Sequence, residues 1–157
     1  MAFSKIGPAC PPELAVTRFV AFLHVADVQR SIDFYAGLGM ACRSQVGPEG
    51  RPVWASLRSA GGDLMLGQAD GPVDPRIQAV MFYAYTPDLT AMRAHLLARG
   101  LRDGGPYLGD TPAVDPFPAS GVVYHVRFPH YLPTGEMRVH DPDGYVVLIA
   151  TSQDAAA

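Results

Sequence analysis

Apolar and polar positions follow the same order twice along this chain. In each copy an apolar stretch is followed by an aspartate, a segment with helical periodicity and a glycine. Asp27 and Gly39 mark the first copy, and Asp88 and Gly100 mark the second, each 61 residues later (88 − 27 and 100 − 39). Repetition of a pattern at a fixed offset indicates that one supersecondary unit occurs twice.

Both copies predict a helix that begins directly after the aspartate. Asp27 and Asp88 are favourable N-cap residues, and Gly37, Gly39 and Gly100 are suited to ending the helices. Apolar residues recur on one face of each predicted helix: Val28, Ile32 and Tyr35 in the first, and Leu89, Met92 and Leu96 in the second.

The remaining apolar stretches predict strands and complete two similar modules. A second correspondence, between Gly62 and Gly144, has an offset of 82 (144 − 62). The fold expected is α+β: two tandem βαβββ modules, residues 16–70 and 78–151, forming a curved mixed sheet around a cavity in a single domain of residues 1–157. Strands are predicted at 16–25, 52–58, 63–68, 121–128, 135–140 and 145–151, and around 81–85 at the start of the second module.

The second module contains an insertion rich in glycine and proline, at about residues 102–120. It accounts for the difference between the two offsets, 21 residues (82 − 61). A loop of this length is typical of a lid or binding loop, and a disordered insertion is the alternative.

Composition narrows the classes of partner. The chain has 157 residues, 48% of them hydrophobic and 17% charged, with a net charge of −3 and no basic run, which argues against nucleic acid. No stretch is long and apolar enough to span a membrane. Cys10 and Cys42 have neither metal-site nor disulfide spacing, which favours a reducing, cytoplasmic location.

Two motifs resemble a known family. One runs through Asp27, Ser31, Phe34, Tyr35 and Gly39, and the other is the turn 141–144, Asp-Pro-Asp-Gly, before the last strand. Together with the repeat, they resemble the vicinal oxygen chelate superfamily, which includes glyoxalase I, extradiol dioxygenases, and bleomycin- and fosfomycin-resistance proteins. The resemblance covers residues 16–151 and implies the same fold, but the fold hosts enzymes and binding proteins alike.

The resemblance also assigns four positions at which catalytic members hold a metal ion. In this chain they are occupied by Val20, Leu66, Met81 and Leu148. Alkyl groups have no lone pair, and a thioether is a poor ligand for the divalent ions concerned. We therefore expect no metal and no cofactor.

Strand alternation predicts what faces the cavity instead. It places aromatic side chains there with a fringe of histidine and arginine, which is typical of a small-molecule site. The predicted ligand-binding residues are Phe22, His24, Trp54, Tyr83, Tyr85, His125, Arg127, Arg138 and His140, with Tyr124 behind them on the helix side.

Several of these residues have a simpler interpretation. His24 fits a hydrogen-bonded core histidine, and Tyr83 and Tyr85 fit a plain strand core equally well. A hairpin would place Arg127 opposite Glu136 as a structural ion pair and His125 opposite Arg138.

Two further groups of polar residues could have a role in a metal site or in a turn. His125, Glu136 and His140 form a less favoured alternative, a relocated metal triad. Asp141 and Asp143 are assigned to stabilising their own turn and not to catalysis.

The function favoured by these observations is metal-free binding of an aromatic or amphiphilic small molecule, in a homodimer. The rival is a lyase, isomerase or dioxygenase-like enzyme of the same superfamily, with His24 or His125 as general base or with a relocated metal. The sequence favours binding over catalysis, and it leaves the ligand open.

Overall fold

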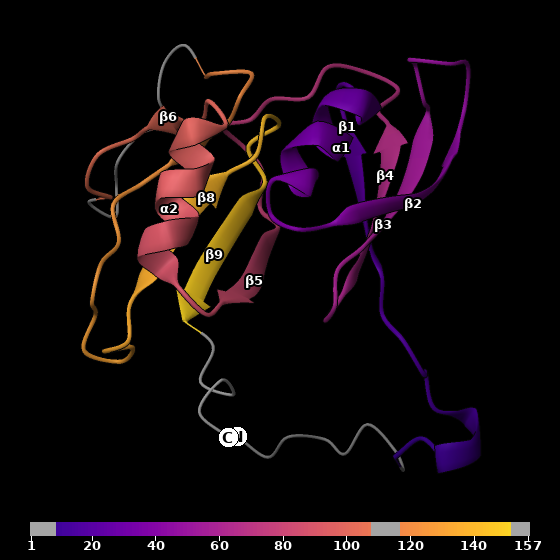
Figure 1. Cartoon of the computed structure of the whole chain (residues 1–157). Coiled ribbons are helices and arrows are strands. Elements are labelled where there is room, and N and C mark those ends of the chain that lie inside the picture. Colours follow the sequence, from indigo (N-terminus) through magenta and orange to yellow (C-terminus); the bar gives the residue numbers. More distant parts are fainter. Residues whose placement is uncertain (1–8, 108–116, 152–157) are drawn as a thin grey trace.

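The computed structural model describes residues 9–107 and 117–151, and two modules lie side by side in it (Figure 1). The first has a four-stranded sheet of order β1-β4-β3-β2 with one helix. Its elements are β1 (Ala21–Val25), α1 (Val28–Ala36), β2 (Ala41–Val46), β3 (Trp54–Arg58) and β4 (Asp63–Gln68), preceded by a short 3-10 helix, η1 (Pro12–Leu14).

The second module repeats this arrangement with one more strand. Its sheet has the order β5-β9-β8-β7-β6, and β5 pairs with β9 in parallel as β1 does with β4. The elements are β5 (Met81–Thr86), α2 (Leu89–Ala98), β6 (Arg102–Asp103), β7 (Val122–Val123), β8 (Glu136–His140) and β9 (Val146–Thr151). The α+β fold with two tandem modules is confirmed, with the strands divided between two sheets.

Both helices begin where the sequence predicts. The Asp27 carboxylate accepts a hydrogen bond from the Arg30 amide, and that of Asp88 accepts one from the Ala91 amide. These bonds satisfy backbone donors that the first turn leaves free. Gly39 and Gly100 follow the helices with φ of 89° and 101°, in the region that favours glycine. None of the helices among the described residues is long and apolar enough to cross a membrane.

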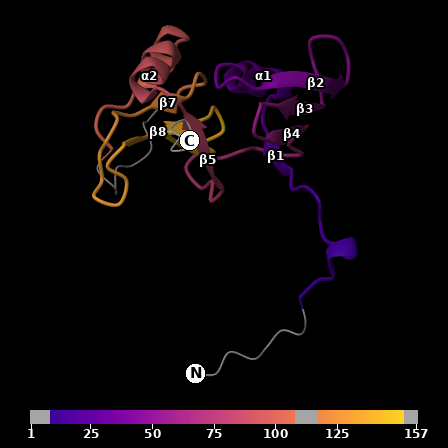
Figure 2. The ribbon, with the colours of Figure 1, turned by 60° about the horizontal axis from the view of Figure 1, so that its bottom comes forward.

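Each sheet packs one face on a helix and leaves the other, here called the open face, without a helix. Leu23 and Val25 of β1 are buried on the helix side, as are Met137 and Val139 of β8, and all four belong to one core cluster that spans both modules. Figure 2 shows α1 and α2 on the same side of the molecule. The open faces are therefore where side chains remain available for binding.

The turn between β8 and β9 joins the modules. Asp141 accepts hydrogen bonds from the amides of Asp143 and Tyr145, as predicted, and also one of 2.7 Å from the Tyr35 hydroxyl of α1. Asp143 accepts bonds from the Ala26 amide at 3.0 Å and from Arg30 at 3.2 Å. Both carboxylates are buried, so this turn forms a polar junction as well as a reversal of the chain.

Two strand predictions need correction, and two strands were not predicted. The first strand begins at Ala21 and not at 16, because its parallel partner β4 begins at Asp63 and pairing starts at Ala21 and Leu64. β2 was not predicted because it is an exposed edge strand without apolar alternation. The two-residue β6 was also missed. Of the predicted strand 121–128, only β7 and an isolated bridge at Arg127 are present.

The predicted lid reaches beyond the described residues. Residues 108–116 of the insertion lie outside them. The lid therefore stays a prediction.

Candidate functional site

Cross-strand pairing arranges the open face of the second module in three rows, since residues paired across a sheet share a face. Tyr85, Ala150, Glu136 and Arg127 form one row; Tyr83, Leu148, Arg138 and Tyr124 form the next; Met81, Val146, His140 and Val122 form the third. The predicted residues Tyr83, Tyr85, Arg127, Arg138 and His140 thus lie together on one surface.

The aromatic residues at the β5 edge of this surface are exposed. Tyr83 is 54% exposed and Tyr85 66%, and their rings stack with centroids 6.4 Å apart. The alternative that they fill a strand core is therefore wrong. Burial and the nearby Glu136 raise the pKa of Tyr83, so its hydroxyl stays protonated at neutral pH. The pair offers an aromatic surface with hydroxyl groups at its margin.

A fully buried carboxylate lies beside these tyrosines. Glu136 accepts hydrogen bonds from the Nε atom of Arg127 at 2.8 Å and from the hydroxyl of Tyr131 at 3.1 Å, and the Nη2 atom of Arg127 lies 2.6 Å from the same oxygen as an ion pair. The Tyr83 hydroxyl lies 3.5 Å from its other oxygen. The predicted ion pair of Arg127 and Glu136 is confirmed, and it neutralises the charge of Arg127 within the chain.

Arg138 has a different environment. Its Nε donates to Nε2 of His140 at 3.0 Å, and its guanidinium lies 4.3 Å from the centre of the Tyr107 ring. Among the described residues no carboxylate forms an ion pair with it. Burial, with the adjacent Arg138 charge, lowers the pKa of His140 to about 4, so the imidazole is neutral at pH 7.

The open face of the first module has a simpler composition. Phe22, Met65 and Ser56 form one row, and His24, Gly67 and Trp54 form the next. Phe22 lies so close over Gly67 that a Cβ there would be 2.7 Å from its ring. His24 is exposed, with its ring centroid 5.0 Å from that of Phe22, so the core-histidine interpretation is wrong. The three predicted residues share this face.

The placement of His125 in the cavity is wrong. Val123 pairs with Val139 but Arg127 bridges to Glu136, so the chain has one extra residue between them, and Tyr124 rather than His125 lies opposite Arg138. An extra residue of this kind reverses the facing of side chains. His125 points to α2, and its Nε2 atom lies 3.6 Å from the Asp103 carboxylate. Tyr124, which was predicted on the helix side, lies on the open face.

The orientation of His125 also decides whether the predicted metal triad can form. His125 and Glu136 lie on opposite faces of the sheet, so they do not meet in a metal triad with His140. Within residues 9–107 and 117–151 no three His, Cys, Asp or Glu side chains are grouped to hold a metal ion.

One of the four positions that the resemblance assigns to metal ligands also shifts by one residue. Tyr83 pairs with Leu148, whereas its counterpart Phe22 pairs with Met65 and not Leu66. Leu66 is fully buried in the helix-side core, because a shift of one residue moves a side chain to the other face. The corrected set is Val20, Met65, Met81 and Leu148, which still lacks the oxygen and nitrogen donors that hard and borderline metal ions require.

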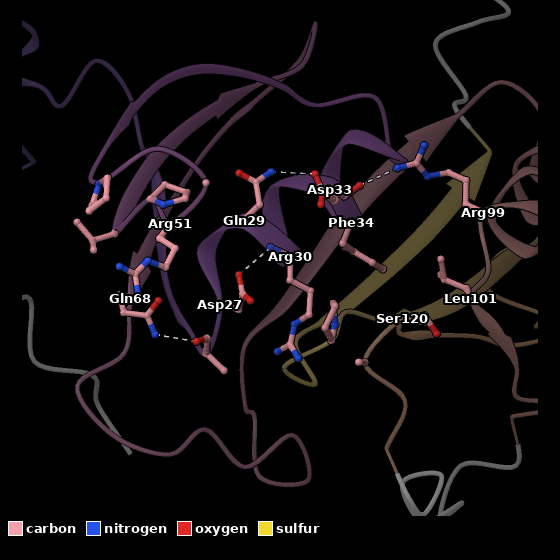
Figure 3. A pocket seen from close by; sticks show the side chains of 17 residues that line it. Asp27, Gln29, Arg30, Asp33, Phe34, Arg51, Gln68, Arg99, Leu101 and Ser120 are labelled. Carbon is pink, nitrogen blue, oxygen red and sulfur yellow. Dashed lines mark hydrogen bonds between the residues drawn. The ribbon is translucent and has the colours of Figure 1, made fainter.

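A cleft of about 800 Å³ lies elsewhere, between α1, the 48–53 loop and the edge of the second module (Figure 3). None of the predicted site residues lines it. Several of its polar groups already serve the fold: Arg30 pairs with Asp143, Arg99 donates to the Asp33 carbonyl, and Asp27 caps α1. We therefore place the candidate site on the open faces.

Sequence comparison finds one family. The model of the Glyoxalase/Bleomycin resistance protein/Dioxygenase superfamily matches residues 17–149. A comparison with curated proteins finds no match.

Three similar solved structures support the fold. A bleomycin resistance determinant encoded on transposon Tn5 has a TM-score of 0.63 and 15% identity, covering 88% of this chain and 99% of its own. The bleomycin-binding protein from Streptomyces verticillus, complexed with copper(II)-bleomycin, has a TM-score of 0.57 and 17% identity, covering 89% and 99%. TnmS3, an antibiotic binding protein from Streptomyces sp. CB03234, has a TM-score of 0.54 and 20% identity, with 89% and 99% covered.

Proposed function

Because this chain belongs to the Glyoxalase/Bleomycin resistance protein/Dioxygenase superfamily, we propose that it is a metal-free protein that binds an aromatic small molecule on its open faces. The observation that carries the proposal is the exposure of large aromatic side chains beside fixed polar groups. Phe22, Tyr83 and Tyr85 are 49%, 54% and 66% exposed, and Glu136 and Arg138 lie in the same rows as the tyrosines. Aromatic walls with a few placed polar groups suit a planar ligand.

Three features support binding over catalysis. The positions that hold metal ions in catalytic relatives carry apolar side chains. His125, one candidate general base, lies on the helix side. Similar structures include proteins described as bleomycin-binding and antibiotic-binding.

We also propose that a second copy covers the open faces and that the ligand lies between the copies. Met81, Tyr83 and Tyr85 form an exposed strip of large side chains along β5, the kind of surface that favours an interaction. The N-terminal segment leaves the body in Figure 2, and its Leu14, Val16 and Phe19 are 71%, 69% and 88% exposed. In the proposed dimer, pairing around a twofold axis covers the β5 strip and the apolar side chains of the N-terminal segment. A monomer by light scattering at micromolar concentration contradicts this part.

The test of binding uses N-phenyl-1-naphthylamine, an uncharged aromatic probe, and the emission of Trp54, the only tryptophan. We expect saturable quenching of Trp54. Tyr83→Ala and His24→Ala should each weaken binding, Tyr83→Ala by about tenfold or more because a buried ring contributes roughly 2 kcal/mol. Both variants should keep the circular dichroism spectrum, since these side chains are exposed.

Ile77→Ala provides the control, because Ile77 is 76% exposed and belongs to no strand. Absence of quenching, or unfolding of both open-face variants, contradicts the proposal. Metal analysis of protein purified without chelator should give far less than one equivalent, and a stoichiometric, tightly held ion contradicts the metal-free part.

A further inference from the structure

The second module contains a group of side chains whose hydrogen-bond donors are only partly satisfied by the residues that the structure describes. We call it the donor niche: Tyr124, Arg138 and His140, bordered by the rings of Tyr107 and Phe117. The Tyr124 hydroxyl and Nδ1 of His140 are buried and have no hydrogen-bond partner among the described residues. Buried polar groups are normally paired because leaving them unpaired costs free energy, so two orphans in one cluster call for an explanation.

The proton positions follow from the contacts. Arg138 has only donors, so its bond to Nε2 of His140 requires that this nitrogen accept. A neutral imidazole then carries its proton on Nδ1, which makes the buried orphan nitrogen a donor. Tyr124, 1% exposed, adds a hydroxyl whose pKa is raised above its ordinary value by burial, so it too carries its proton.

The charge of the niche is also uncompensated. Arg127, on the neighbouring row, is neutralised by Glu136. Arg138 forms no ion pair within the described residues and is held instead by the Tyr107 ring and the His140 nitrogen. The niche therefore combines one cation with two neutral donors, and none of residues 9–107 and 117–151 supplies an acceptor to the two donors.

The rings complete a compact site. Phe117 stacks on His140 with centroids 6.1 Å apart, Tyr124 meets His140 edge-on at 5.3 Å, and Tyr107 meets Tyr124 at 5.2 Å. Aromatic neighbours exclude water and strengthen charge-assisted hydrogen bonds.

From these observations we infer that the donor niche binds an anionic oxygen group, a carboxylate, sulfonate or phenolate, carried by the aromatic ligand. The inference rests on the proposed function and specifies it: the β5 tyrosines hold the ring, and Arg138 with Tyr124 and His140 holds the acid group. The ligand class is thus an aromatic acid rather than a neutral aromatic.

The experiment compares two probes that differ by one group. N-phenyl-1-naphthylamine is neutral, and 8-anilino-1-naphthalenesulfonate has the same aromatic body with a sulfonate. Arg138→Gln should weaken binding of the sulfonate at least about tenfold, the usual effect of losing a charge-assisted hydrogen bond, and change binding of the neutral probe less than about twofold. Arg76→Gln removes the same charge from an exposed site and should change neither.

Tyr124→Phe separates binding from folding. It removes only a hydroxyl that has no partner in the folded chain, so the melting temperature should stay the same or rise while the sulfonate probe binds more weakly. A lower melting temperature with unchanged sulfonate binding assigns the hydroxyl to the fold and overturns its role in the niche.

The outcomes distinguish the two proposals. If neither probe binds the wild-type protein, the proposed function itself fails. If both bind but Arg138→Gln affects them equally, or affects neither, the binding surface stands and the donor niche does not recognise an anion.

Discussion

The two modules have the same arrangement of strands and helix, but their open faces differ. In the first, the rows consist of Phe22, Met65 and Ser56, and of His24, Gly67 and Trp54. In the second, the equivalent surface carries Glu136, Arg127, Arg138 and His140. The helix-facing sides are apolar in both, because close packing limits what can replace a core residue. A repeated unit therefore keeps its core and diverges where no packing constrains it.

The turns before β4 and β9 show the same divergence. Ser59 and Gly62 close an exposed turn by a backbone hydrogen bond. Asp141 and Asp143, in the corresponding turn of the second module, are buried against α1 and hold the modules together. The turn before β4 therefore stabilises only its own loop, whereas the turn before β9 also contacts the other module.

The strongest test of this comparison is to remove the junction. Asp143→Ala deprives the Ala26 amide and Arg30 of their partner, and we expect a loss of about 3 kcal/mol in the free energy of unfolding. Ser59→Ala, in the exposed turn, should change it by less than about 0.5 kcal/mol. Urea unfolding measures both, and equal effects show that the two turns do not differ in role.

A second test compares ion pairs in the two sheets. Arg127→Met leaves Glu136, whose side chain is 0% exposed, with only tyrosine hydroxyls as partners. We expect a loss of about 2 kcal/mol, below the usual value for a buried pair because Arg127 is 42% exposed. Arg58→Met breaks the exposed pair with Asp63 and should have little effect. A larger loss of stability for Arg58→Met than for Arg127→Met contradicts this expectation.

The smallest net effect concerns pH, because two groups of the second module act in opposite directions and largely cancel in the wild-type protein. Burial raises the pKa of Asp141 to about 7, so the native state keeps a proton that the unfolded state loses, and this contribution to stability falls between about pH 4 and 7. Because the pKa of His140 is lowered to about 4, the unfolded state instead binds the extra proton between pH 4 and 6.5, and stability rises with pH there.

Single substitutions separate the two contributions. Between pH 4 and 6.5, the stability of Asp141→Asn should rise with pH more steeply than that of the wild type. The stability of His140→Asn should fall with increasing pH over the same range. Each change of slope is at most about 1.4 kcal/mol per pH unit, the value for one proton. Urea midpoints at four pH values measure it. Parallel curves for both variants show that neither group titrates as described.

Much of the fold was predictable because its signals are local. The aspartates that cap α1 and α2, the glycines that follow them and the alternation on β1, β5 and β8 depend on residues a few positions apart. The edge strand β2 escaped prediction because its side chains are exposed and carry no apolar alternation.

The candidate site was predictable only in part. Alternation placed Phe22, His24, Tyr83, Tyr85, Arg138 and His140 on the open faces. It failed at His125 and Tyr124 because a single extra residue reversed the facing, and it failed at Leu66 because the offset read from the turn differs by one from the register of the strands. Tyr107 and Phe117, both within the insertion, carry no local signal for their contact with Arg138 and His140.

The sequence by itself determined the repeated unit, the helix boundaries and the apolar character of the positions where relatives hold a metal ion. Short-range capping, periodicity and side-chain chemistry suffice for these. Only the tertiary structure decided which turn joins the modules, that Arg127 but not Arg138 has an ion-pair partner within the described residues, and which buried donors there lack one. Those properties depend on strand register and on contacts between residues as far apart as Ala26 and Asp143, where a shift of one residue changes the partner of every side chain.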